Sequence, residues 1–355
     1  MTTPVKNPLV TYLFLAYNQQ EFVREAVISA LSQTYTPMQI IISDDCSPDA
    51  TYEIMAAEVA KYQGSNEIVL RQNNPNLGIG GHINQLMELA RGELIVVAAG
   101  DDVSLPNRVE RIVAEWNKAP NEINSLYSKV EVMDESGRHI RYLGSAWDNS
   151  TTLPAAVQSL CMGVLGASHA WHRRIFDVFG PMLSDSMYED RILSMRSLLL
   201  GKIVYIDEPL VQYRAHEANT SVVNRKIMDV LNFPKERKRI VLRLQRISNV
   251  LDNYERDILT ARTLNDGRKY VGALEAVVDY KRGNEIETVL WSSGLFQRLN
   301  AFRSLCSVRA ESSRLIKGVV LAVSPFLYFY LELPLRVSGN VHRLFQSRLS
   351  HTRFK

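Results

Sequence analysis

Short apolar runs alternate with helical stretches along the first third of the chain, and this alternation constrains the fold more than any other feature. The apolar runs cover residues 9–15, 39–43, 68–70 and 94–99, and the stretches with helical spacing that follow them are 21–33, 51–62, 81–90 and 106–117. Strands and helices in this order predict a mostly parallel sheet with helices on both faces. Runs without polar alternation are expected where both sheet faces are covered. The sequence therefore predicts the α/β class.

The composition is that of a globular protein and excludes a disordered, collagen-like or low-complexity chain, since 46% of residues are hydrophobic and 22% are charged. The 355 residues suffice for one large domain with an appendage or for two modest domains. Three widely spaced cysteines without a CxxC pair disfavour a disulfide framework and a structural zinc site. Residues 1–8 lack the features of a signal peptide, which predicts a cytoplasmic protein.

Polar clusters follow three of the predicted strands, at the point where each strand ends. They are Tyr17-Asn18, Asp44-Asp45 and Asp101-Asp102. Each cluster alone could be ordinary turn or helix-cap chemistry. Because ligands bind beyond the carboxyl ends of the strands in such sheets, three clusters in phase predict one shared ligand site.

Paired carboxylates at a strand end suit Mg²⁺ or Mn²⁺ bound to a diphosphate, because these cations prefer oxygen ligands. The chain has no GxxxxGK[ST] sequence and no GxGxxG after the first strand, which disfavours a P-loop NTPase and a dinucleotide-binding site. The glycines of residues 78–81 follow the third strand instead, where they would let the backbone approach a ligand closely. A diphosphate held by a metal without a phosphate-cradling loop indicates a nucleotide-sugar site.

A set of short motifs carries a resemblance to a known family. In chain order they are Ala16-Tyr17-Asn18, LSQTY at 31–35, DDCSPDAT at 44–51, NLG at 76–78, RGE at 91–93, GDD at 100–102, YEDR at 188–191, GKIVYIDEPL at 201–210 and YRAH at 213–216. Together they resemble the family 2 glycosyltransferases, which have the GT-A fold, over about residues 8–220. The resemblance implies a GT-A catalytic domain at 1–220, with a donor half at about 1–115 and an acceptor half at about 116–220. Residues 221–355 lie outside it and are predicted to form a helical C-terminal extension.

The resemblance also implies roles for individual residues. The donor-binding positions are Ala16, Tyr17, Asp45, Gly78, Asp101 and Asp102. Among them, Tyr17 and Asp45 would contact the base and ribose, and Asp102 would be the direct ligand of the divalent cation, Mg²⁺ or Mn²⁺. Asp190 would be the general base that deprotonates the acceptor hydroxyl. The family inverts the anomeric carbon by direct displacement, so that the cation offsets charge on the leaving diphosphate and one base suffices.

Three further residues carry alternative interpretations. His216 would approach the diphosphate or the metal, although an ordinary core or surface histidine fits the pattern as well. Glu189 would shape the acceptor pocket or be a solvated carboxylate at a helix start. Trp171 would stack on an acceptor sugar or pack in the core.

The C-terminal region, 221–355, differs from the rest in charge. It contains 24 Lys and Arg against 12 Asp and Glu, whereas residues 1–220 contain 17 against 26. Helices are predicted at 235–251, 254–264 and 269–281, and they would pack on the catalytic domain or on a second copy in a homo-oligomer. Within the segment 315–335, the run GVVLAVSPFLYFYL is too short to span a bilayer, so its basic setting predicts an interfacial anchor on an anionic membrane, with core packing as the alternative.

These features together predict an inverting glycosyltransferase, peripheral on the cytoplasmic face of a bacterial membrane. Its donor would be a nucleotide-diphosphate sugar and its acceptor a glycan or lipid-linked glycan, in the synthesis of a cell-surface polysaccharide such as O-antigen, capsule or lipopolysaccharide. No nucleic-acid partner is expected. A processive synthase is disfavoured because QxxRW and several spanning helices are missing, and a nucleotidyltransferase because its Gly-rich first loop is missing. The remaining alternative is a catalytically silent nucleotide-sugar-binding or scaffold protein, which the four residues Asp45, Asp101, Asp102 and Asp190 disfavour.

Overall fold

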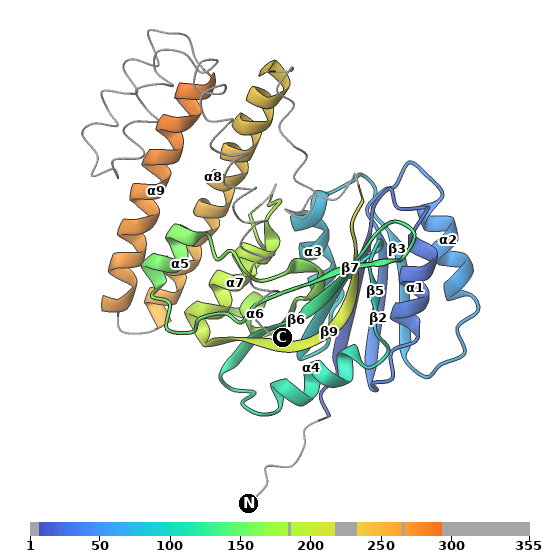
Figure 1. Cartoon of the computed structure of the whole chain (residues 1–355). Helices are drawn as coiled ribbons and strands as arrows, with labels where there is room; N and C mark the ends of the chain where they lie inside the picture. The colour runs from blue at the N-terminus through green and yellow to red at the C-terminus, as the bar shows by residue number, and fades with distance from the viewer. Residues whose placement is uncertain (1–6, 184–185, 217–232, 265–266, 293–355) are drawn as a thin grey trace, which may run out of the picture. The chain divides into compact units, whose positions relative to one another are not determined.

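The computed structural model of the protein describes residues 7–183, 186–216, 233–264 and 267–292 (Figure 1). The chain divides into two compact units, one made of Met1–Asn224 with Asn249–Val277 and the other of Arg225–Ser248 with Val278–Lys355. The first unit contains the sheet and all the predicted site residues.

One sheet organises the first unit, with the strand order β3-β2-β1-β4-β8-β6-β9-β5 and with β7 paired to β6 off this path. Its parallel part consists of β1 (Val10–Ala16), β2 (Met38–Asp44), β3 (Glu67–Gln72) and β4 (Leu94–Ala99). The other strands are β5 (Val103–Ser104), β6 (Ile123–Met133), β7 (His139–Leu143), β8 (Ala170–His172) and β9 (Lys202–Arg214). β8 is antiparallel to both β4 and β6, so β6 and β9 run in the same direction as β1 to β4. The carboxyl ends of six strands therefore share one edge.

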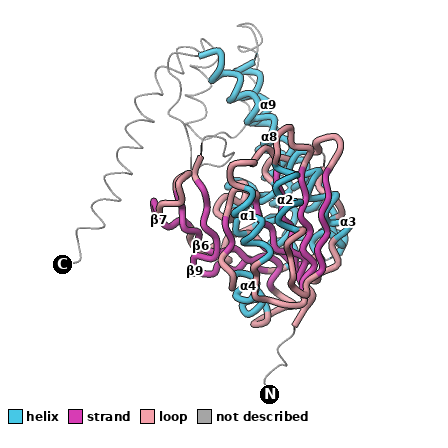
Figure 2. The backbone as a smooth tube through the Cα atoms, turned by 90° about the vertical axis from the view of Figure 1, so that its right-hand side faces the viewer, coloured by secondary structure: helices cyan, strands magenta, loops and turns pink. Residues whose placement is uncertain are grey.

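Helices cover both faces of this sheet, which confirms the predicted α/β class. The helices before β9 are α1 (Val23–Leu31), α2 (Thr51–Val59), α3 (Gly78–Leu89), α4 (Arg108–Trp116), α5 (Leu153–Ser159), α6 (Arg174–Phe179) and α7 (Glu189–Leu200), with the short 3₁₀ helix η1 at Gly166–Ser168. Figure 1 shows α1 and α2 on the opposite side of the parallel strands from α3. Figure 2, turned by 90°, shows β6, β7 and β9 gathered at one side of the sheet.

The sequence pattern explains this layering. All seven residues of β1 are buried, as expected for a central strand covered on both faces. In α4 the buried apolar residues are Val109, Ile112, Val113 and Trp116, which follow helical spacing along one stripe. That stripe packs in the same core cluster as Tyr12 and Phe14 of β1.

Several helix boundaries differ from those predicted. The glycines at 78–81 form the first turn of α3 and not a separate loop before it. The two helices predicted at 235–251 and 254–264 form one helix, α8 (Phe233–Leu264), because Asn253 is buried and bonded within the structure and does not break the helix. The next helix, α9 (Arg268–Ser292), runs past the predicted end at residue 281.

The second unit is described for residues 233–248 of α8 and 278–292 of α9. Asn284 Nδ2 of α9 donates to the carbonyl of Leu244 in α8 at 2.8 Å, and Ile247 and Leu290 are buried. No helix among the described residues is long and apolar enough to span a bilayer. The predicted interfacial segment 315–335 lies outside the described residues.

Candidate active site

The loops after β1 and β2 are joined by hydrogen bonds at the carboxyl edge of the sheet. The Asp45 amide donates to the Ala16 carbonyl at 2.9 Å, and the Asn18 amide donates to Ser47 Oγ at 2.8 Å. Asn18 and Cys46 have φ of 55° and 63°, a left-handed backbone that non-glycine residues adopt only in special turns. The Tyr17 side chain, which follows β1 directly, is 51% exposed. The two loops are thus held together by hydrogen bonds, and the Tyr17 ring beside them is exposed.

The neighbouring carboxylates Asp44 and Asp45 have different hydrogen-bond partners. Asp44 Oδ2 accepts from the Ser47 amide at 2.8 Å and from Gln72 Nε2 at 2.9 Å, which makes Asp44 part of the loop's framework. Asp45 Oδ1 accepts from Asn73 Nδ2 at 2.7 Å and from the Leu77 amide at 2.9 Å. These bonds tie Asp45 to the connection between β3 and α3.

Glycines in this region are required by close contacts within the chain. A Cβ on Gly100 would lie 2.5 Å from Gln19 Oε1 and 2.9 Å from the Ala16 Cβ. A Cβ on Gly80 would lie 2.6 Å from the carbonyl oxygen of Ser186. Gly78 opens α3 with φ of +68°, which favours glycine. At Gly80 the close neighbour is the protein's own backbone, and the approach to a ligand predicted for the glycine cluster stays a prediction.

The acidic pair Asp101-Asp102 follows β4 and is held by residues at the end of β9. His216 Nε2 and Asp101 Oδ2 are joined by a hydrogen bond of 2.8 Å. The Arg214 amide donates to Asp102 Oδ1 at 2.9 Å. The Phe22 ring lies 5.0 Å from both the His216 ring and the Arg214 guanidinium. The structure thus brings His216 to the acidic pair.

Burial and mutual repulsion dominate the electrostatics of this pair. Asp102 is 4% exposed, and burial together with the Asp101 charge raises the pKa of Asp102 well above its ordinary value. The guanidinium groups of Arg108 and Arg214 oppose this rise in pKa. A cation bound at the pair would oppose it further, because it favours the ionised carboxylates.

The side chains present fit a divalent cation whose coordination shell is completed by oxygens of a bound substrate. Among the described residues, no three His, Cys, Asp or Glu side chains are arranged to hold a metal ion by themselves. Mg²⁺ is commonly bound by one or two carboxylates plus substrate phosphates, so a complete protein cage is not required. Two adjacent buried carboxylates with an imidazole beside them provide such a partial donor set.

Arg108 and Arg214 are the residues of this site that the sequence reading missed. Arg108 is fully buried, and its guanidinium donates to Ser104 Oγ at 2.9 Å and to the carbonyls of Val97 at 2.8 Å and Ala167 at 3.3 Å. The helix dipole disfavours a positive charge in the first turn of a helix. The position of Arg108 at the start of α4 is therefore the one sequence feature that could have indicated a special role. Arg214 lies within a quoted motif, yet nothing local in the sequence shows that its amide reaches Asp102.

Asp190 and Glu189 open α7 and contact η1. A Cβ on Gly166 of η1 would lie 3.3 Å from Glu189 Oε1 and 3.5 Å from the Asp190 Cβ. Burial raises the pKa of Asp190, and burial together with the Asp190 charge raises the pKa of Glu189 to about 8. The Val97 amide of β4 donates to the carbonyl of His169, directly after η1, at 3.2 Å. η1 therefore connects the strand that leads to the acidic pair with the start of α7.

Trp171 lies in the core and not on a surface. Its side chain is 0% exposed, and its ring packs against His169 and Phe176 with centroid distances of 5.5 and 6.4 Å. Of the two interpretations of Trp171, packing in the core is the one that the structure shows. A fully buried ring cannot stack on an acceptor sugar.

Comparison with known proteins indicates which family the chain resembles. Residues 13–178, just under half of the chain, match the family model described as "Glycosyl transferase family 2". Over these residues the chain is similar to this family. The chain is 27% identical over 205 residues to an uncharacterised protein of Mycobacterium tuberculosis, a match that covers 57% of each chain. It is 31% identical over 157 residues to the succinoglycan biosynthesis protein ExoO of Rhizobium meliloti, covering 43% of each. It is 26% identical over 290 residues to the chondroitin synthase of Pasteurella multocida, covering 79% of this chain and 27% of the synthase.

Solved structures show the same fold. The chain superposes on residues 1–349 of S. aureus TarS, solved in complex with UDP-GlcNAc, with a TM-score of 0.52 and 15% identity, covering 92% of this chain and 91% of that chain. This likeness confirms the predicted GT-A fold. The match to the mycobacterial relative covers little more than half of that relative's length.

Proposed function

We propose that the protein transfers a sugar, with inversion, from a nucleotide-diphosphate sugar to a hydroxyl of a glycan or lipid-linked glycan. The observation that supports this most is the buried pair Asp101-Asp102, joined to His216 and connected through η1 to the paired carboxylates Glu189-Asp190. One carboxylate pair suits a diphosphate with its cation, and the other suits a proton acceptor. The catalytic domain is proposed at 1–220, with a donor half at 1–115 and an acceptor half at 116–220; 249–277 belongs to the same compact unit.

The donor would lie along the loops that follow β1, β2 and β4. Tyr17 would contact the base, Asp45 the ribose, and Ala16 and Gly78 would border the nucleotide. Asp102, supported by Asp101, would hold Mg²⁺ or Mn²⁺, with His216 as a further ligand. The cation would offset the charge of the leaving diphosphate.

The oxygen of the acceptor hydroxyl would attack the anomeric carbon while Asp190 takes the hydroxyl proton. The bond between the anomeric carbon and the phosphate oxygen of the donor would break at the same time. The electrostatics support this assignment. Burial raises the pKa of both carboxyls, that of Glu189 to about 8, so the pair retains a proton near neutral pH. In our proposal Glu189 carries this proton and Asp190 is the carboxylate that accepts the proton of the hydroxyl.

The biological setting is proposed from the relatives and from the basic C-terminal region. The chondroitin synthase and the succinoglycan protein are named for polysaccharide synthesis. We propose a bacterial cell-surface polysaccharide (O-antigen, capsule or lipopolysaccharide) as the product. The segment 315–335 would attach the protein peripherally to the anionic cytoplasmic face of the membrane, and the C-terminal helices would support a homo-oligomer.

A panel of nucleotide sugars tests this function. The purified protein is incubated with UDP-GlcNAc, GDP-mannose and related donors, with Mg²⁺ or Mn²⁺, and release of the nucleoside diphosphate is measured. Asp190→Asn should lower turnover roughly 10²–10⁴-fold while donor binding survives. The matched control is Asp148→Asn, an exposed aspartate whose Oδ1 accepts from the amide and the Oγ of the nearby Ser150. Donor binding without turnover under every condition would instead indicate the silent binding protein.

A further inference from the structure

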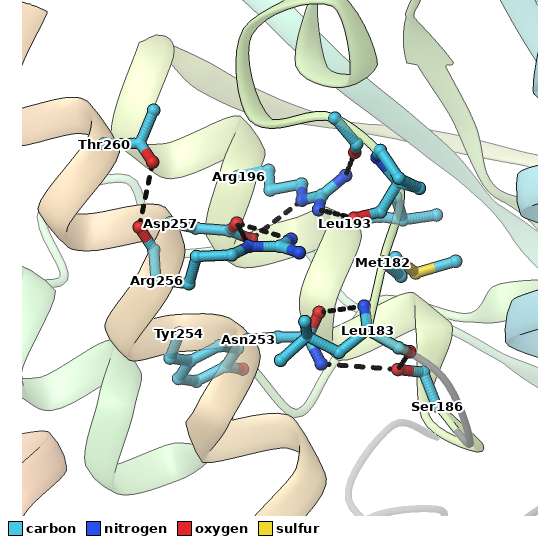
Figure 3. A network of polar contacts seen from close by, with 12 residues as sticks. Met182, Leu183, Ser186, Leu193, Arg196, Asn253, Tyr254, Arg256, Asp257 and Thr260 are labelled. Carbon is cyan, nitrogen blue, oxygen red and sulfur yellow. Dashed lines mark hydrogen bonds and ion pairs between the residues drawn. The ribbon is translucent and has the colours of Figure 1, made fainter.

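Asn253, Tyr254 and Asp257 lie within about one turn of α8, and their buried polar side chains reach the segment that carries the proposed base (Figure 3). They lie beyond residue 178, where the family match ends, and beyond residue 220, where the motif resemblance ends. All of them belong to the first compact unit together with α7. No motif in the sequence assigned them a role.

Asp257 forms a fully buried ion pair with Arg196 of α7. Arg196 Nε donates to Asp257 Oδ2 at 2.8 Å, and both side chains are 0% exposed. Arg196 also donates to the Gly180 carbonyl at 2.8 Å, and its guanidinium lies 5.2 Å from the centre of the Phe176 ring. Buried charges are costly unless they are paired and fully hydrogen-bonded, so this pair fixes α7, α8 and the end of α6 in one arrangement.

Asn253 holds the chain just before α7. Its Oδ1 accepts from the Leu183 amide at 2.9 Å, and its Nδ2 donates to Ser186 Oγ at 3.3 Å. From the other side, Asn84 of α3 exchanges two bonds of 2.8 Å with the backbone of Met182. Asn84 of the proposed donor half and Asn253 of α8 therefore bond to the backbone of two neighbouring residues, Met182 and Leu183.

Tyr254 reaches the first turn of α7 itself. Its hydroxyl donates to the carbonyl of Arg191 at 3.2 Å, and its ring is completely buried. Arg191 is the residue directly after Asp190, and the Arg191 amide donates to Asp190 Oδ1 at 2.8 Å. The contact from α8 thus ends on the peptide unit next to the proposed base.

We propose that Asn253, Tyr254 and Asp257 are positioning residues that hold Asp190 in place for catalysis, so that this stretch of α8 is part of the acceptor side of the enzyme. The inference rests on the proposed function of Asp190. Apolar side chains would suffice for packing alone, whereas these polar groups bond to backbone and side-chain atoms of Leu183, Ser186, Arg191 and Arg196. Such directed bonds specify where the first turn of α7 lies, and displacement of a catalytic group by about 1 Å can cost 10²-fold in rate.

Two variants and one control test the positioning role. Tyr254→Phe removes only the hydroxyl, and Asn253→Leu removes the amide at similar size. The control, Thr260→Val, removes a hydroxyl whose 3.0 Å bond goes to Arg256 of the same helix. For each protein we would measure backbone hydrogen exchange of peptides covering 186–195, binding of UDP-GlcNAc or GDP-mannose, and turnover of the donor that the panel identifies.

We expect faster exchange in α7 and a kcat lowered about 3–10-fold in Tyr254→Phe and about 10–100-fold in Asn253→Leu. Donor affinity should stay within about twofold, because the donor loops follow β1, β2 and β4, and Thr260→Val should match the wild type. Full turnover in both variants, measured where Asp190→Asn is inactive, would overturn the positioning role. If Asn253→Leu does not fold, Tyr254→Phe alone decides. Full turnover in Asp190→Asn would instead contradict the proposed function, which separates the two failures.

Discussion

His216 Nε2 lies 2.8 Å from Asp101 Oδ2, although the two residues are 115 positions apart in the chain. The contact exists because β9 ends at the same edge of the sheet as β4, and the chain leaves β9 toward the acidic pair. The Arg214 guanidinium adds a second connection, since it donates to Glu25 Oε2 of α1 at 2.5 Å. The end of β9 therefore joins the two halves of the proposed catalytic domain at the place where a donor diphosphate would bind.

Replacement of the proposed metal ligand should stop turnover. In Asp102→Asn one oxygen ligand and one negative charge are lost, so release of nucleoside diphosphate should fall by roughly 10²-fold or more. Excess EDTA should silence the wild type in the same assay, and Asp148→Asn should behave as wild type. Full activity in excess EDTA would disprove the cation assignment.

Loss of the buried guanidinium of Arg108 should destabilise the fold strongly. Arg108→Met leaves the carbonyls of Val97 and Ala167 without this donor, and the expected cost is about 2–4 kcal/mol in the free energy of unfolding by urea. The matched control is Arg111→Met on the same helix, whose ion pair with Glu208 is partly exposed. Such a pair contributes little to stability, because water screens the two charges. Equal effects of the two substitutions would contradict the structural role of Arg108.

Gly80 and Gly272 should respond in opposite directions to replacement by alanine. At Gly80 a Cβ would meet the Ser186 carbonyl at 2.6 Å, so Gly80→Ala should cost about 1–3 kcal/mol. At Gly272 in α9 the nearest atom would be the Pro154 Cγ at 3.4 Å, an ordinary contact. Gly272→Ala should therefore stabilise by up to about 1 kcal/mol. Thermal unfolding of both variants checks the signs.

The sequence predicted those parts of the site that depend on local pattern. The strands and their polar ends at Tyr17, Asp45 and Asp102 could be located, because apolar runs mark strands and parallel strands end at one edge. The pairing of His216 with Asp101 could not, since it depends on how β9 returns through the sheet. The break predicted between residues 251 and 254 is wrong, since Asn253 continues the helix and bonds to Leu183 and Ser186, distant partners that the sequence does not reveal.

Stability should decrease in acid because of His169. Burial lowers the pKa of His169 to about 3, whereas the unfolded value is about 6.5. Between these values the unfolded chain binds more protons, so the neutral buried imidazole contributes stability above pH 6.5 that is lost as the pH falls toward 3. The loss should reach roughly 2–3 kcal/mol by pH 4.5. His169→Gln should flatten this slope, as measured by urea unfolding at pH 7 and at pH 4.5.

Glu189 should produce the opposite dependence on pH. Its pKa is raised to about 8 in the folded state from the ordinary value of 4.5, so between those values the native state binds more protons than the unfolded chain. Stability should therefore fall as the pH rises from 4.5 to 8, by an amount on the order of 1–3 kcal/mol, since the side chain is partly exposed. Glu189→Gln carries no titrating group and should be more stable than the wild type at pH 8.5 but not at pH 4.5.

The same variant should keep its turnover at pH 7, because it mimics the protonated Glu189 that leaves Asp190 as the base. Loss of turnover at pH 7 in a folded Glu189→Gln protein would show that the ionised Glu189 carboxylate is itself required.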